Sequence, residues 1–188
     1  MIPYTTSPRA DTGVSNVTLG IWLFLASEVM LFGALFSSYA LLRVAASSWP
    51  SGGDVLSLSL GVTNTMVLML MTGAAWRARS AMWPTARRLL VVCSVLAVVF
   101  LGVKSIEYAG EIRQGLVPSV NTFLATYFTL TGLHALHVIA GLVVNVWALT
   151  GVRRVGMDMT TGRIRALALY WAFVDAVWVI IFILFYLS

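Results

Sequence analysis

The stretch LLVVCSVLAVVFLGVKSI, residues 89–106, decides the class of fold, because it places a nearly unbroken apolar run in mid-chain. A helix needs about 20 mostly apolar residues to cross the hydrocarbon core of a bilayer. The sequence therefore predicts an all-α, polytopic membrane protein, in which a polar tail (residues 1–17) precedes a single domain formed by a bundle of five transmembrane helices. The other four spans are expected at residues 18–44, 55–76, 123–149 and 166–187.

The overall composition supports a lipid environment. Sixty per cent of the 188 residues are hydrophobic and 10% are charged, whereas an ordinary soluble domain has about 25% charged residues. The net charge is +5, but the basic residues do not form one run, which argues against a nucleic-acid partner. The single cysteine, Cys93, lies inside an apolar run, so an internal disulfide and a Cys-based metal site are both excluded.

The arginines indicate how the chain is oriented. With five spans, the tail, the second loop and the fourth loop lie on one side of the membrane. The opposite side carries chiefly Arg43 and Arg113. The positive-inside rule then places the N-terminus in the cytoplasm and the C-terminus outside. The remaining arginines are expected to set this topology and to contact lipid head groups: Arg9, Arg77, Arg79, Arg87, Arg88, Arg153, Arg154, Arg163 and Arg165.

Four ionisable residues lie deep within the predicted spans: Glu28, His134, His137 and Asp175. A charged carboxylate at the centre of a bilayer costs at least about 2.5 kcal/mol. A rise of about 1.5 Å per residue places all four in one layer, and we expect at least one hydrogen bond between a histidine and a carboxylate there. His134 and His137 share one helix face. Because no third histidine and no additional cysteine completes a site, the spacing favours structural histidines over metal or haem ligands.

The polar residues have different expected roles. Burial disfavours the charged form of a carboxylate, which would suit Glu28 to a proton path, but a structural or lipid-cleft role is equally open. Asp175 is expected to be a structural anchor. Lys104 and Glu107, at i, i+3 spacing, are expected to form a salt bridge at the outer end of the third helix, with Lys104 extending toward the interface.

Small residues mark the expected helix contacts, because they let helices approach closely in lipid. On the first predicted helix, Gly33 and Ser37 lie four residues apart. On the fourth predicted helix, the corresponding residues are Gly132, Gly141 and Asn145. We therefore expect close helix packing on these two faces.

The motifs within the spans resemble those of the cytochrome c oxidase subunit III family. The most specific is TGLHALHVIAG at residues 131–141. Ala172 departs from the family, which usually has a histidine there. The chain also lacks the first two helices of the long, seven-helix forms and is similar to the short bacterial form. The other matching segments, in the order of the predicted helices, are WLFLASEVMLF (22–32), NT (64–65), KSIEY (104–108) and YWAFVDAVW (170–178).

This resemblance implies an accessory, non-catalytic subunit III of a proton-pumping haem-copper terminal oxidase in the bacterial plasma membrane. It implies that subunit I is the main partner, that haem and copper lie in subunits I and II, and that this chain binds phospholipid but no redox cofactor or metal. A larger respiratory supercomplex is a further candidate partner. The resemblance assigns lipid binding to His134, His137 and Glu28, and support of proton uptake to the buried polar residues.

Two alternatives stay open, and a third does not fit the sequence. Cytochrome c is the favoured electron donor of the complex, but a quinol oxidase or an oxidase-like protein associated with nitric oxide reductase would have a similar subunit. From a different class, a haem-binding membrane anchor could use His134 or His137 as an axial ligand. A small transporter would be expected to show broken helices in two inverted halves, and five unbroken spans do not fit that pattern.

Overall fold

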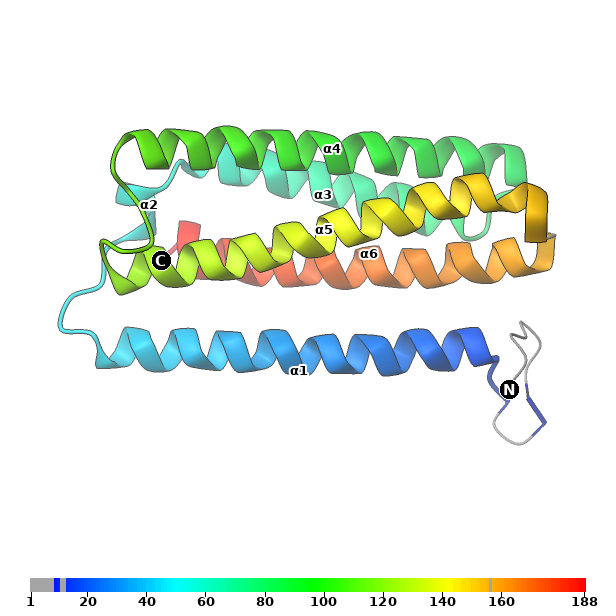
Figure 1. Cartoon of the computed structure of the whole chain (residues 1–188), viewed down its shortest axis with the longest axis horizontal. Helices are drawn as coiled ribbons and strands as arrows, with labels where there is room; N and C mark the ends of the chain where they lie inside the picture. The colour runs from blue at the N-terminus through cyan, green and yellow to red at the C-terminus, as the bar shows by residue number, and fades with distance from the viewer. Residues whose placement is uncertain (1–8, 11–12, 156) are drawn as a thin grey trace.

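The chain folds as a bundle of long helices that lie side by side (Figure 1). The computed structural model describes residues 9–10, 13–155 and 157–188, and it describes side chains in these ranges outside residues 151–160. In the described part, five helices are long and apolar enough to cross a membrane and no strand is present, so the predicted all-α, five-span fold is confirmed. The elements are α1 (Asn16–Ala45), the short α2 (Gly52–Val55), α3 (Leu58–Ala78), α4 (Trp83–Arg113), α5 (Thr122–Val155) and α6 (Met157–Tyr186).

Helix α4 differs most from its predicted bounds. It begins at Trp83 rather than Leu89 and ends at Arg113 rather than Ile106. Pro84 precedes the predicted start of this span at Leu89, but it lies in the first turn of α4, where a backbone without an N–H loses no intrahelical hydrogen bond. At the other end the helix continues past Ile106, and Glu107 and Glu111 turn their side chains into the bundle.

Helix α1 lies along one edge of the bundle (Figure 1), where it packs against α6 and, over a smaller area, α5. In the most apolar 18-residue stretch of α1, only 11% of the residues are buried, whereas 44% are buried in the corresponding stretch of α6. The two indoles of α6, Trp171 and Trp178, are fully buried. Helix α6 is therefore at the centre of the packing, whereas most of the α1 surface is left for lipid or for another subunit.

Of the three glycines that were predicted to lie at close helix contacts, only Gly141 does. A Cβ atom on Gly141 would lie 2.6 Å from the Trp171 ring, so α5 approaches α6 closely at this glycine, as predicted. A Cβ atom on Gly33 would meet nothing within 4 Å, and one on Gly132 would come no closer than 3.9 Å to the Tyr108 hydroxyl. The prediction of close packing at Gly33 and Gly132 is therefore wrong, because these positions do not face a closely packed neighbour.

Two further polar residues show how the predicted helix faces are used. Asn145 is fully buried and donates hydrogen bonds to the Leu90 carbonyl (2.8 Å) and the Ser94 hydroxyl (2.9 Å) of α4. Ser37 is exposed, and its hydroxyl donates to the carbonyl of Gly33 in its own helix. Asn145 therefore joins two helices as expected, whereas Ser37 does not.

Candidate functional site

A histidine–carboxylate bridge joins the edge helix to the bundle. Nε2 of His137 on α5 lies 2.9 Å from Oε2 of Glu28 on α1, and both side chains are 14% exposed. The other ring nitrogen of His137 lies 2.8 Å from the Leu133 carbonyl, one turn earlier on α5. The edge of the imidazole also packs on the Phe32 ring, with centroids 5.1 Å apart. The predicted histidine–carboxylate hydrogen bond is thus confirmed.

The hydrogen bonds of this bridge show that His137 and Glu28 share one proton between Nε2 and Oε2. A carbonyl oxygen only accepts, so Nδ1 of His137 carries the hydrogen that it donates to Leu133. The 2.9 Å contact between Nε2 and Glu28 then also needs a hydrogen. This hydrogen comes from an imidazolium if Glu28 is ionised, or from the carboxylic acid if the ring is neutral. In both cases one proton lies between the two groups and the pair has no net charge.

His134 is separate from this bridge. It is 1% exposed, and neither of its ring nitrogens has a hydrogen-bond partner in the described part of the chain. Its imidazole packs against the Phe100 and Trp178 rings, with centroids 5.5 Å and 5.1 Å away, and these two rings also contact each other. These ring contacts and the near-complete burial favour a packed core residue over a ligand of haem. Within the described residues, no group of three or more His, Cys, Asp or Glu side chains gathers.

Asp175 lies on α6, beside α3 rather than beside the histidines. Its carboxyl lies near Thr72 of α3, whose hydroxyl donates to the Trp171 carbonyl at 3.2 Å, and its Oδ1 atom is buried without a hydrogen-bond partner in the described part. The Trp178 indole donates to the Thr65 hydroxyl of α3 at 3.0 Å, while no partner is found for the Trp171 indole among the described residues. The structure therefore joins Glu28 to His137 and leaves His134 and Asp175 in separate surroundings.

Lys104 and Glu107 form the predicted ion pair, with Nζ and Oε2 3.0 Å apart. The expected position of this pair at a helix end is wrong, because α4 continues to Arg113 and both side chains are almost completely buried. Lys104 does not extend to the interface. Its Nζ also donates to the hydroxyls of Tyr127 on α5 (2.7 Å) and Tyr186 on α6 (2.8 Å).

A second carboxylate completes this group of residues. The Tyr127 hydroxyl donates to Oε1 of Glu111 at 2.8 Å, and the Tyr186 hydroxyl donates to Oε1 of Glu107 at 2.6 Å. Sequence reasoning missed Glu111 and both tyrosines. The spacing of positions 104, 107 and 111 on one helix face could have indicated the carboxylate. We call these five residues the Lys104 cluster: Lys104, Glu107, Glu111, Tyr127 and Tyr186.

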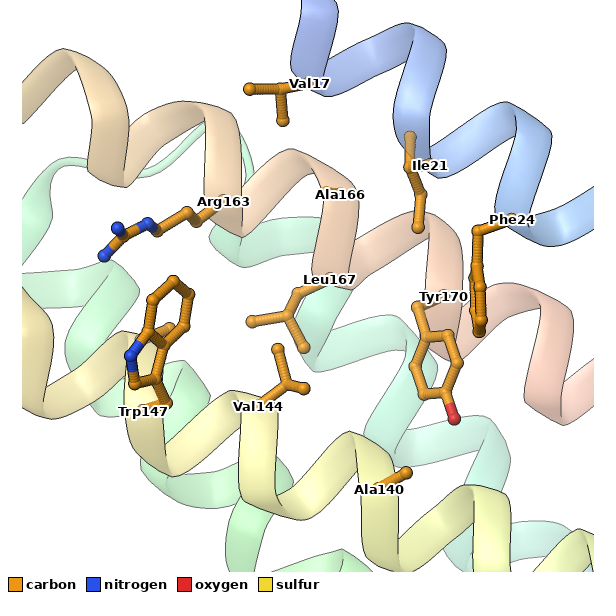
Figure 2. A pocket seen from close by; sticks show the side chains of 11 residues that line it. Val17, Ile21, Phe24, Ala140, Val144, Trp147, Arg163, Ala166, Leu167 and Tyr170 are labelled. Atoms are coloured by element: carbon orange, nitrogen blue, oxygen red, sulfur yellow. The ribbon is translucent and has the colours of Figure 1, made fainter. Parts of the chain in front are cut away.

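An apolar groove runs between α1, α5 and α6 (Figure 2) and encloses about 280 Å³. At one end Arg163 stands beside Trp147, with its guanidinium carbon 3.9 Å from the indole centroid. At the other end lie Phe24 and Tyr170. The Tyr170 hydroxyl donates to the carbonyl of His137 at 2.7 Å, so the groove ends next to the Glu28–His137 bridge.

Comparison with known proteins identifies similar chains. The sequence model of the family described as cytochrome c oxidase subunit III matches residues 8–188. Subunit 3 of the cytochrome bo(3) ubiquinol oxidase of Pseudomonas aeruginosa is 32% identical over 182 residues, covering 94% of this chain and 87% of the relative. The cytochrome c oxidase subunit 3 of Alkalihalophilus pseudofirmus is 31% identical over 187 residues (95% and 90%). The heme-copper oxidase subunit I+III of Aeropyrum pernix is 30% identical over 184 residues (92% and 23%).

Proposed function

Because the chain belongs to the cytochrome c oxidase subunit III family, we propose that it is an accessory, non-catalytic subunit of a proton-pumping haem-copper oxidase in the bacterial plasma membrane. The match over residues 8–188, which includes all five spans, carries this proposal. The Aeropyrum relative is named subunit I+III, and this chain covers 23% of it. That fusion supports subunit I as the main partner. The proposal places haem and copper in subunits I and II.

Purification of the tagged chain from its native membrane tests this assignment. We expect subunits I and II to co-purify, and the haem absorption of the complex to be absent from the isolated chain. A Soret band in the isolated chain would instead support the haem-anchor alternative. Copper-ligating cysteines and histidines in the co-purified subunit II would assign cytochrome c as the donor, and their absence would assign a quinol. Recovery of the chain without an oxidase core would refute the proposal.

The second part of the proposal is that the Glu28–His137 bridge supports proton uptake by the complex. The bridge holds one proton, it has no net charge, and each side chain is 14% exposed. A proton that moves between the two groups leaves the pair neutral in both forms, so the bridge can pass a proton from one side chain to the other without creating a net buried charge. The bridge also connects α1 with α5, so its loss would loosen the edge helix.

Glu28→Gln separates these two roles. The glutamine amide can donate a hydrogen bond to Nε2 of His137 but cannot supply a transferable proton. We expect turnover-coupled proton uptake by the purified complex to slow several-fold, while its melting temperature stays close to that of the parent. The matched variant Glu28→Ala also loses the hydrogen bond and should be destabilised by about 1 kcal/mol. Unchanged proton uptake in Glu28→Gln would leave the bridge with a structural role only.

The third part of the proposal is that the groove of Figure 2 holds a phospholipid. Its wall is almost wholly apolar, as an acyl chain requires, and Arg163 lies at one end. Nε of Arg163 is buried and has no hydrogen-bond partner among the described residues, and a guanidinium at the end of an apolar groove is suited to bind a lipid phosphate. At the inner end the acyl chain would approach His137 and Glu28. His134 is 1% exposed and packs against two aromatic rings, so the proposal leaves it out of the lipid site, contrary to the role that the family resemblance implies.

Arg163→Leu tests this lipid site. A hydrogen bond to a charged group contributes about 1.5–3 kcal/mol, so loss of the guanidinium should weaken binding at least tenfold. Native mass spectrometry of the purified complex should then show one fewer bound phospholipid. Arg165→Leu is the matched control, because Arg165 is exposed and does not line the groove. An equal lipid count in the two variants would contradict the proposal.

A further inference from the structure

The Lys104 cluster lies apart from both the bridge and the groove. It is formed by residues near the C-terminal ends of α4 and α6 and near the N-terminal end of α5. These three helix ends lie together at one end of the bundle (Figure 1). All five members of the cluster are buried. The cluster contains one potential cation and two potential anions within a membrane-spanning bundle, so its charge balance needs an explanation.

The hydrogen bonds of the cluster can be counted donor by donor. A lysine ammonium has three N–H groups, and Nζ of Lys104 has three acceptors: Oε2 of Glu107 at 3.0 Å, the Tyr127 hydroxyl at 2.7 Å and the Tyr186 hydroxyl at 2.8 Å. Each tyrosine then has one hydrogen to donate. Tyr186 donates to Glu107 and Tyr127 donates to Glu111. Glu107 therefore contacts the lysine charge directly, whereas Glu111 is connected to it only through Tyr127.

Glu111 is the member whose charge is not matched. The residue is 5% exposed, and its Oε2 atom is buried without a hydrogen-bond partner in the described part of the chain. An ionised Glu111 would leave the cluster with a net charge of −1 and one carboxylate oxygen unsatisfied. A buried charge without a partner is strongly unfavourable, whereas the neutral acid is not.

The surroundings supply no second cation in the described part of the chain. Tyr108 of α4 lies beside the cluster, but its hydroxyl shares a 2.6 Å hydrogen bond with the Thr131 hydroxyl. On α5, His134 is the next titratable group, and it packs against the Phe100 and Trp178 rings. On α6, Tyr186 is already a member of the cluster. Neither of the two further groups, Tyr108 and His134, forms an ion pair with Glu111.

We propose that Glu111 binds a proton on its free oxygen, and that the Lys104 cluster is a second proton-binding site, independent of the Glu28–His137 bridge. The bound proton makes the cluster neutral: Lys104 balances Glu107, and Glu111 accepts from Tyr127 as a carboxylic acid. In a neutral cluster, the one lysine charge balances one ionised carboxyl, and the other carboxyl is protonated. Removing Glu107 should therefore leave Glu111 ionised, whereas removing Lys104 should leave both Glu107 and Glu111 protonated.

Infrared spectroscopy of the purified complex tests this proposal. A protonated carboxyl has a C=O stretching band that is separate from the carboxylate bands. In a Glu28→Gln background, which removes any contribution from the bridge, Glu111→Gln should remove one such acid band. Lys104→Met, made in the same Glu28→Gln background with Glu111 intact, should instead add one acid band to the parent spectrum, because Glu107 loses its counterion. A Glu111→Gln spectrum that differs from its parent only in the carboxylate bands would overturn the proposal.

Stability provides a second readout if Lys104→Met does not assemble. Glutamine closely resembles a protonated glutamate in shape and charge, so the complex with Glu111→Gln should keep its melting temperature. Glu107→Gln is the matched variant on the same helix face, and it should melt at a clearly lower temperature, because Lys104 loses its direct counterion. Equal destabilisation by the two variants would show that Glu111 is an ionised partner of Lys104 and would also overturn the proposal.

Discussion

Replacing Lys104 with methionine is expected to destabilise the folded subunit by about 3–5 kcal/mol, the usual cost of removing one partner from a buried ion pair. The substitution removes the 3.0 Å pair with Glu107 and the hydrogen bonds to Tyr127 and Tyr186. These bonds join α4 to α5 and α6 at the end of the bundle. Unfolding of the purified subunit in mixed micelles, followed by helical circular dichroism, would measure the loss.

The double variant Lys104→Met, Glu107→Gln is the control for this prediction. It removes both charges of the pair, and replacing a buried ion pair by neutral groups of similar size is often nearly neutral. We expect it to recover more than half of the stability lost in the single variant, which a double-mutant cycle would report as coupling. A loss of less than about 1 kcal/mol in the single variant would instead be typical of an exposed salt bridge.

Introducing a single methyl group at Gly141 should also have a large effect, because α5 meets α6 at this glycine. The new Cβ would lie 2.6 Å from one atom of the Trp171 ring and 2.7 Å from the Tyr170 ring. Overpacking of this kind costs about 1–3 kcal/mol. Gly141→Ala should therefore lower the melting temperature of the complex, and it should disturb the groove as well, because Tyr170 lines it.

Gly33→Ala on α1 is the matched control for Gly141→Ala. No atom lies within 4 Å of the position that its Cβ would occupy, so alanine should be accommodated without a clash. Alanine is favoured over glycine in a helix by about 1 kcal/mol, and the variant should be as stable as the parent or slightly more stable. Equal losses at the two positions would show that α1 packs on another part of the complex through Gly33.

The comparison of Lys104 with Glu28 shows how far the sequence could predict the polar sites. The similar depth of Glu28, His134, His137 and Asp175 was enough to predict a hydrogen bond between a histidine and a carboxylate, but not that Glu28 and His137 would form it. Lys104 and Glu107 were placed at a helix end, because the apolar run stops at Ile106. Helix α4 continues to Arg113, and its polar residues are satisfied by tyrosines from α5 and α6. These partners lie about 20 or 80 residues away in the chain.

The number of spans, their order and the family follow from the sequence by itself, because apolar runs long enough to cross a bilayer form helices there: lipid offers their backbone groups no other hydrogen-bond partners. The predicted orientation likewise uses only the positions of the arginines in the sequence. Only the tertiary structure decided which side chains meet. It placed α1 at the edge of the bundle, joined Glu28 to His137 while leaving His134 among aromatic rings, and completed the Lys104 cluster. The physical reason is that the rotation of each helix about its axis depends on side-chain packing with its neighbours, and this packing is not encoded in the length or composition of any one span.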